Sequence, residues 1–225
     1  MEDSSRSFPE ALLISDIFQM IAAGQKAKVI YSLRENPELA SKPNAEGITP
    51  LLFAIYYGKE DIVQSYLGTG IPLNLFEAAA LGKEERVREL VEKDPSLVRS
   101  YSPDGWTPLH LAAHYGRLPL IEYLLEKGAD IHAKSKSKLS IGNTALHSAV
   151  AAWKEEAVAL LLEKGADPNF TQEGGFSALH IAASRQGNQN IVSLLLKKGA
   201  NPDLKTDDGK TARDIAAERG VAFQS

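Results

Sequence analysis

The sequence has no cysteine, only two methionines and two tryptophans, and no long run of apolar residues. Without cysteine there is no disulfide, no thiol nucleophile and no zinc site built on thiolates. No basic segment followed by an apolar stretch opens the chain, so we expect no secretory leader. No stretch is apolar over the roughly 20 residues that a spanning helix needs. A cytoplasmic protein without membrane contact is the default expectation.

An excess of basic residues is also missing. Lys and Arg number 25 against 29 Asp and Glu, which gives a net charge of −4 over 225 residues. This balance argues against general binding of nucleic acid. The charged fraction of 24% and the hydrophobic fraction of 44% are ordinary for a folded domain.

One stretch, residues 104–131, shows the organisation most clearly. Asp104-Gly105 is a turn signal, and Thr107-Pro108 is a helix start, because Thr can cap free N–H groups and Pro loses no hydrogen bond in the first turn. The spacing predicts a helix over 109–115 that ends at Gly116, then a second helix that ends at Gly128. One such helix pair cannot bury its own apolar face, so copies are expected.

Copies of the stretch are present. Thr107-Pro108-Leu109-His110-Leu111-Ala112-Ala113 recurs in altered form at 143–149 and 176–183, and Gly-Ala-Asp or Gly-Ala-Asn follows at 128–130, 165–167 and 199–201. This pattern resembles the ankyrin repeat, a unit of about 33 residues, over nearly the whole chain. The resemblance implies an all-α solenoid of helix-turn-helix units with short β-hairpin fingers.

The pattern predicts a flexible N-terminal arm at 1–14 and one elongated ankyrin-repeat domain at 15–225. We number its seven repeats in chain order, with repeats one and seven as capping units: 15–43, 44–72, 73–101, 102–134, 139–171, 172–204 and 205–225. Capping units are expected because an end repeat exposes a stacking face.

A longer period underlies the first four repeats. Residues 17–74 align with 75–132 at a constant offset of 58, so that Phe18, Gly24 and Pro37 correspond to Phe76, Gly82 and Pro95. We infer a tandem duplication of a two-repeat module in which a repeat without a finger precedes one with a finger.

Three histidines recur at one position of the repeat. In the family, this histidine bridges the backbone and the Thr hydroxyl around the turn, which implies a structural role for the pairs Thr107/His110, Thr144/His147 and Ser177/His180. The alternative is a metal-binding or hydrolytic protein, because His110 and His114 lie four apart on one helix. No acidic residue follows the first histidine, as a zincin would require, since Leu111 stands there. We therefore expect no cofactor, no metal and no enzyme activity.

The finger of repeat five is longer than the others. Leu109 and Leu146 are 37 residues apart, about four more than a regular repeat, and the insertion carries Lys134, Lys136 and Lys138 in alternation. On an extended strand all three would share one face. A contact with an acidic partner or a phosphate and a merely solvated loop are both compatible with this pattern.

The resemblance also indicates where a partner would bind. The family uses finger residues and the exposed end of the first helix, on the concave side. The corresponding positions here are Ile48, Tyr56, Tyr57, Asp104, Trp106, His114, Tyr115, Lys136, Asn143, Phe176 and Arg185. We expect a monomeric, non-catalytic protein-interaction module that acts as adaptor, scaffold or inhibitor on an unidentified protein partner, without a small-molecule substrate. A regulator of transcription that masks a factor is a second possibility.

Overall fold

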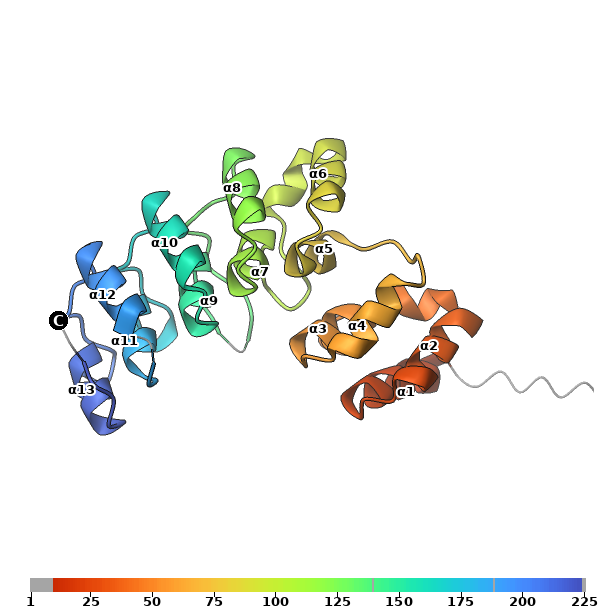
Figure 1. The fold of residues 1–225 in the computed structure, drawn as a ribbon, viewed down its shortest axis with the longest axis horizontal. Coiled ribbons are helices and arrows are strands. Elements are labelled where there is room, and N and C mark those ends of the chain that lie inside the picture. The colour runs from red at the N-terminus through yellow and green to blue at the C-terminus, as the bar shows by residue number, and fades with distance from the viewer. Residues whose placement is uncertain (1–9, 139, 188, 224–225) are drawn as a thin grey trace, which may run out of the picture. The chain divides into compact units, whose positions relative to one another are not determined.

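The computed structural model describes residues 10–138, 140–187 and 189–223, with the backbone alone for 10–15. Among these residues the structure is mostly helical, so the predicted all-α fold class is confirmed (Figure 1). The elements are α1 Glu10–Ala22, α2 Lys26–Glu35, η1 Pro37–Ser41, α3 Pro50–Tyr56, α4 Glu60–Leu67, α5 Leu75–Leu81, α6 Glu84–Lys93, η2 Pro95–Arg99, α7 Pro108–His114, α8 Leu118–Glu126, α9 Ala145–Ala151, α10 Glu155–Glu163, η3 Glu173–Gly175, α11 Ala178–Ala183, α12 Gln189–Lys197 and α13 Ala212–Glu218, where η marks a 3-10 helix.

The chain divides into two compact units at Glu77 and Ala78. In the N-terminal unit, α1 packs against α2 and α3, and α2 packs against α4. The core of this unit is made of fully buried side chains from all four helices, among them Ile17, Leu33, Leu51 and Ile62.

The C-terminal unit contains two rows of helices. The first helix of each repeat contacts the next first helix, so that α9 lies between α7 and α11, and α13 follows α11 (Figure 1). The second helices α8, α10 and α12 pack on one another in the same order. Leu109, Leu124, Leu146, Leu161 and Leu179 fill the space between the rows and are fully buried. Each helix pair thus buries its apolar face against its neighbours, as stacking requires.

The predicted 58-residue offset is confirmed by the element bounds. α2, η1 and α3 occupy the positions of α6, η2 and α7 shifted by 58 residues, without a difference of a single residue at either end. The sequence pattern predicted these α-helices. It did not predict that each repeat without a finger ends in a 3-10 helix, which begins at Pro37 in one repeat and at Pro95 in the other.

The fingers are hydrogen-bonded turns rather than the β-hairpins expected. Two backbone bonds close each one, for example Ser102 N–H to Trp106 O at 2.8 Å and Gly105 N–H to Ser102 O at 2.8 Å. Within the described ranges, the one β-bridge outside helices joins Thr171 and Ser177. Each described finger is closed by backbone bonds around a single residue pair, such as Ser102 and Trp106 or Gln172 and Phe176, and one pair does not make a ladder.

Neighbouring fingers of the C-terminal unit are joined through their backbones. Lys136 N–H donates to Gly105 O at 2.8 Å, Glu173 N–H to Ile141 O at 3.0 Å, and Asp207 N–H to Gly174 O at 2.9 Å. Gly105 must be glycine here, because its φ is +91° and a Cβ would lie 2.3 Å from Ser137 N. The fingers therefore form one continuous hydrogen-bonded edge from repeat four to repeat seven.

The N-terminal arm differs from the prediction where the structure describes it. α1 begins at Glu10, so residues 10–14 belong to a helix instead of the arm. The run Ala11-Leu12-Leu13 consists of strong helix formers and extends the helix toward the N-terminus. Residues 1–9 of the predicted arm lie outside the described residues.

The junction of repeats two and three has no finger, and a buried carboxylate lies there instead. Thr49 caps α3, but Leu52 stands where other repeats have histidine, and Thr49 Oγ1 donates to Glu77 Oε1 at 2.5 Å. Asn74 N–H donates to Glu77 Oε2 at 2.9 Å, and Glu77 N–H donates to Asn74 Oδ1 at 3.0 Å. Glu77 is 3% exposed. Burial raises the pKa of its carboxyl, while the bonds from Thr49 and Asn74 lower it in part.

Replacing Glu77 by Ala is expected to reduce the free energy of unfolding by about 2 kcal/mol, because Thr49 and the Asn74 N–H would lose a buried acceptor. Adding Leu52→His should recover part of this loss by giving Thr49 a partner on its own helix. Urea unfolding measures both effects, with the exposed Glu85→Ala as control. An unchanged midpoint in Glu77→Ala would show that the contact contributes nothing.

Candidate partner-binding surface

The histidine of repeat four has both ring nitrogens engaged. His110 Nδ1 lies 2.7 Å from Thr107 Oγ1, and His110 Nε2 lies 2.8 Å from Asn143 O in the next finger. Thr107 N–H also donates to His110 Nδ1 at 3.3 Å. Since Nδ1 accepts this bond, Nε2 carries the proton and donates to the carbonyl. Burial lowers the pKa of His110 to about 4, so the ring is neutral at physiological pH.

The next two repeats contain the same contact at Nδ1, and in His180 Nε2 is engaged as well. His147 Nδ1 lies 2.9 Å from Thr144 Oγ1, and His180 Nδ1 lies 2.8 Å from Ser177 Oγ. His180 Nε2 lies 3.1 Å from Leu204 O and 3.2 Å from Lys210 O, in the following repeat. Burial lowers the pKa of both, that of His147 to about 4. These contacts favour a structural role for all three pairs.

The pair His110 and His114 does not form a metal site in this geometry. His110 is engaged as described, whereas His114 is exposed and its ring lies edge-on to Tyr115 with centroids 4.9 Å apart. Desolvation and, second, the charge of Lys154 lower the pKa of His114. Among the described residues, no three His, Asp or Glu side chains are grouped as metal ligands.

The residues predicted to bind a partner differ in accessibility. Tyr57, His114, Lys136 and Arg185 are exposed, and Tyr56, Asp104, Trp106, Tyr115 and Phe176 are half-buried. Ile48 and Asn143 are buried, at 9% and 6% exposure. Both lie at the closing pair of a finger, where Ile48 O accepts from Asn44 N–H and Asn143 O accepts from Ser135 N–H. We therefore leave these two out of the candidate surface.

The exposed aromatic side chains occur in both compact units. In the N-terminal unit, Tyr57 is 60% exposed and stacks on Phe53 with ring centroids 4.3 Å apart. Phe53 in turn meets Phe18 edge-on at 5.2 Å. This cluster is a continuation of the core that reaches solvent at the end of α3.

Trp153 is the residue whose backbone conformation and exposure were hardest to predict from the sequence. It follows α9 at the position that Gly82 and Gly116 occupy after α5 and α7, and its backbone has φ +58°, the one positive value among described residues other than glycine. The side chain is 45% exposed. Its ring edge packs beside Gly187, where a Cβ would lie 3.3 Å from Trp153 Cζ3. The sequence indicates that this position is unusual, because the largest amino acid replaces the glycine found at the corresponding positions.

Side chains from the loops that follow α7 and α9 pack over the corresponding loops of neighbouring repeats. Arg117 Nε donates to Ala80 O at 2.9 Å, and its stem lies over Gly82. The stem of Lys154 lies over Gly116 in the same way. Because Lys154 reaches back to α7 and Trp153 reaches forward to Gly187, the ends of α7, α9 and α11 form one connected surface.

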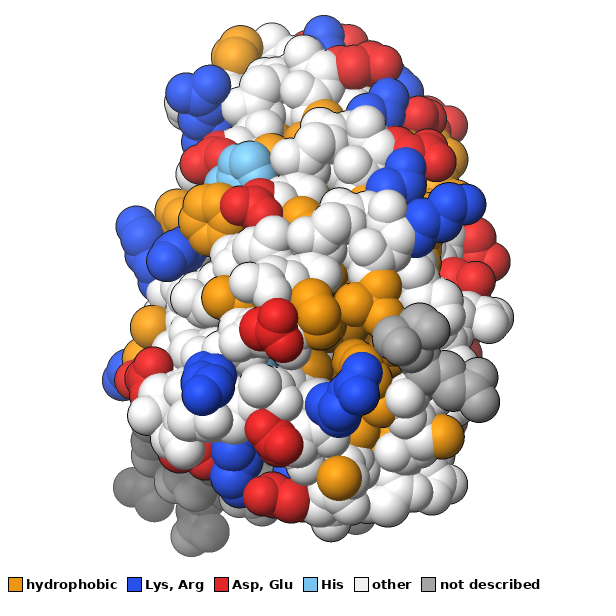
Figure 2. Space-filling view, turned by 90° about the vertical axis from the view of Figure 1, so that its left-hand side faces the viewer, with side chains coloured by type: hydrophobic (Ala, Val, Ile, Leu, Met, Phe, Trp, Pro, Cys, Tyr) orange, Lys and Arg blue, Asp and Glu red, His pale blue; other side chains and the backbone are white. Residues whose placement is uncertain are grey.

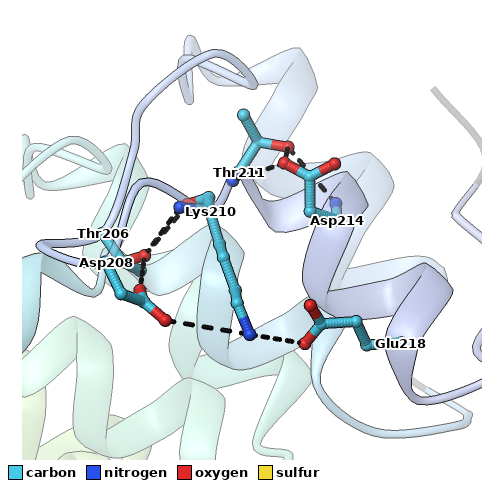
Figure 3. Close-up of polar contacts among 6 residues, drawn as sticks. All are labelled: Thr206, Asp208, Lys210, Thr211, Asp214 and Glu218. Carbon is cyan, nitrogen blue, oxygen red and sulfur yellow. Dashed lines mark hydrogen bonds and ion pairs between the residues drawn. The ribbon is translucent and has the colours of Figure 1, made fainter.

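The last finger holds a separate group of polar contacts (Figure 3). Asp214 takes the place of the histidine, and its Oδ2 accepts from Thr211 Oγ1 at 2.7 Å and from Thr211 N–H at 2.9 Å. Lys210 Nζ lies 2.7 Å from Glu218 Oε2 and 3.7 Å from Asp208 Oδ2. These bonds lower the pKa of Asp214 and raise that of Lys210. The cluster closes its own turn and offers no free site.

The sequence of this chain matches a known protein family. A family model that describes ankyrin repeats in three copies matches residues 75–172 and 151–222. The chain belongs to the ankyrin-repeat family. Ankyrin repeats are generally protein–protein interaction modules, and the family is typically non-catalytic.

Individual ankyrin-repeat relatives match about half of the chain. Alpha-latrocrustotoxin-Lt1a of Latrodectus tredecimguttatus is 30% identical over 119 residues, 49% of this chain and 8% of the relative. The ankyrin repeat and SAM domain-containing protein 6 of Rattus norvegicus is 36% identical over 108 residues, 48% of this chain and 12% of the relative. The nuclear factor NF-kappa-B p105 subunit of Gallus gallus is 29% identical over 152 residues, 61% of this chain and 15% of the relative. The chain therefore spans less than a sixth of each.

The surface of this ankyrin-repeat chain carries charges of both signs. On the face turned toward the C-terminal end, Lys and Arg side chains are interspersed with Asp and Glu around apolar side chains (Figure 2). Within the described part of the chain, no helix is long and apolar enough to cross a bilayer.

Proposed function

We propose that this chain is a non-catalytic protein-binding module that acts as adaptor, scaffold or inhibitor. Its proposed binding surface, which we call the helix-end surface, comprises Trp106 of finger four together with His114, Tyr115, Trp153 and Arg185 at the ends of α7, α9 and α11. The observation that carries the proposal is Trp153, an exposed indole on a left-handed backbone.

A tryptophan at this position is unfavourable in the free chain. A left-handed conformation costs a residue other than glycine about 1 kcal/mol or more, and half-exposure leaves much apolar ring surface in water. Glycine occupies the corresponding positions 82 and 116 without that cost. Strained residues persist chiefly at functional sites, and tryptophan is the residue most enriched among interface hot spots.

The neighbours of Trp153 suit protein recognition. His114 and Arg185 supply exposed polar groups at the ends of α7 and α11, the two helices that pack against α9, and Tyr115 offers a ring whose hydroxyl pKa burial raises to about 12. Aromatic anchors surrounded by polar groups are typical of interface centres. Because the surrounding loops are held by Arg117 and Lys154, little ordering should be needed on binding.

The substitution Trp153→Gly separates binding from stability. We expect the free energy of unfolding to change by less than about 1 kcal/mol, because relief of backbone strain offsets the lost contact with Gly187. The affinity for a partner should fall by about 2 kcal/mol, roughly 30-fold. The partner would first be captured by wild-type protein, then purified and titrated against both forms by calorimetry.

A matched control is Tyr31→Ala, which removes another exposed aromatic side chain, 65% exposed, from α2 in the N-terminal unit. It should leave the affinity unchanged. If Trp153→Gly binds as tightly as wild type, the helix-end surface is not the binding site.

A further inference from the structure

The finger of repeat five is held rigidly on both sides. Ser135 N–H donates to Asn143 O at 2.7 Å, and Gly142 N–H donates to Ser135 O at 3.1 Å, which closes the finger. Ser135 Oγ accepts from Asn143 N–H at 3.1 Å and donates to Ser140 O. The bonds from Lys136 N–H to Gly105 O and from Glu173 N–H to Ile141 O join it to fingers four and six. The backbone at Ser135 and Lys136 and at residues 141–143 is therefore held before any partner arrives.

Side chains along residues 134–138 alternate between solvent and protein. Ser135 and Ser137 are 4% and 3% exposed, whereas Lys134, Lys136 and Lys138 are all exposed. Alternation of this kind places Lys134 and Lys136 on one side of the finger, about 7 Å apart where the backbone is extended, and Lys138 follows at the turn. We call these three residues the lysine row.

Two of the lysines lie over aromatic rings, one at the end of repeat three and one in repeat five. Lys136 Nζ is 4.0 Å from the centroid of Tyr101, and Lys134 Nζ is 5.7 Å from that of Phe170. Aromatic faces attract the ammonium group and orient it. Within the ranges that the structure describes, no carboxylate lies at ion-pair distance from the lysine row, since the ion pairs present are elsewhere.

The charge of this row contrasts with that of the whole chain. Three positive charges occupy five residues, although the chain carries a net charge of −4. Next to the row, Ile141 is one of the few large apolar side chains that are exposed, at 47%. A fixed cationic row beside an exposed aliphatic group is complementary to an extended acidic segment that also carries an apolar residue.

We propose that the lysine row and Ile141 bind an extended acidic segment of a protein partner, with carboxylates on alternate residues. This inference rests on the proposed protein-binding function and specifies the chemistry of the partner. The backbone bond from Lys136 to Gly105 joins the row to the finger that carries Trp106, so one partner can reach both. A nucleic acid fits less well, because three lysines neutralise too few phosphates to hold it at physiological salt.

The test uses a defined probe. A fluorescein-labelled peptide of twelve residues, with Glu and Ser alternating around one central Ile, is titrated with the full chain and followed by anisotropy. We expect binding that weakens as salt rises, and no binding of the same peptide with Gln in place of Glu. Lys134→Glu, Lys136→Glu and Lys138→Glu together should weaken binding roughly 30-fold, because three attractions become repulsions.

The control reverses three other exposed lysines of the same unit, Lys197, Lys198 and Lys205, and thus changes the net charge equally. It should bind within about 3-fold of wild type. Unfolding curves establish that both triple variants remain folded. Absence of binding by wild type, equal loss in the control triple, or tighter binding of a twelve-nucleotide single-stranded DNA would each overturn the inference. None of these results alters the Trp153→Gly measurement, which tests the proposed function independently.

Discussion

Acidification from pH 7 to pH 4 is expected to lower the free energy of unfolding by several kcal/mol. His110, His147 and His180 are buried, at 1%, 0% and 1% exposure, and burial lowers the pKa of each, to about 4 for the first two. In the unfolded chain a histidine titrates near 6.5. The unfolded state therefore binds more protons than the folded state between about pH 6.5 and 4.

The sign of the effect follows from this difference. A base whose pKa is lowered by folding contributes full stability above its unfolded pKa and loses it as the pH falls toward the folded value. His110 and His147 each contribute a slope of about 1.4 kcal/mol per pH unit within that window, and His180 acts in the same direction. Glu77 acts in the opposite direction, because its raised pKa favours the folded state in acid, but it is one group against three.

The measurement is urea unfolding at half-unit steps of pH from 7.5 to 4, followed by circular dichroism. His147→Gln is the matched control, because Gln at this third helical position can still complete the capping box but does not titrate. It should reduce the slope near pH 5 by about a third. A stability that does not vary with pH would show that the three rings are protonated in the folded chain or are not buried.

Replacing Trp106 and Tyr115 together by Ala is expected to weaken partner binding by about 3 kcal/mol, more than 100-fold. Both side chains are half-buried, and the Trp106 ring lies 5.6 Å from that of His110. Because part of each ring is buried, the free energy of unfolding should also fall. The fall should be only on the order of 1 kcal/mol, because the exposed part of each ring contributes little to folding. Calorimetry with the captured partner and unfolding in urea measure the two quantities.

Tyr115→Phe separates the ring from its hydroxyl. Burial raises the pKa of the Tyr115 hydroxyl to about 12 and also limits the contact of this hydroxyl with a partner. The phenylalanine variant should therefore bind within a few-fold of wild type. If the double alanine loses as much stability as binding free energy, the two rings belong to the core and the helix-end surface has to be drawn around Trp153 alone.

The fold was predictable from sequence because its determinants are local. Thr107-Pro108 and Gly116 mark the ends of a helix by capping and by positive φ, and these rules hold without knowledge of the neighbours. Because the helix pair recurs along the chain, the stacking of neighbouring pairs could also be predicted. The fingers were expected as β-hairpins because the family resemblance implies them, whereas the number of residue pairs that hydrogen-bond in each finger depends on its packing against the neighbouring fingers.

The candidate surface was less predictable because exposure depends on contacts between repeats. Ile48 and Asn143 occupy positions that a partner could use in the family, yet the closing pair of each finger buries them here. The contact of Glu77 with Thr49 joins residues 28 apart and could not be found by matching each repeat to the pattern. The left-handed backbone of Trp153 was implied by its alignment with glycines, but its exposure required the structure.

Hydrogen–deuterium exchange of the chain with and without its captured partner tests the central claim most directly. The helix-end surface predicts new protection at the ends of α7, α9 and α11 and in finger four, with exchange in α8, α10 and α12 unchanged. Protection confined to these second helices, or spread evenly over all repeats, would contradict a binding site built around Trp153.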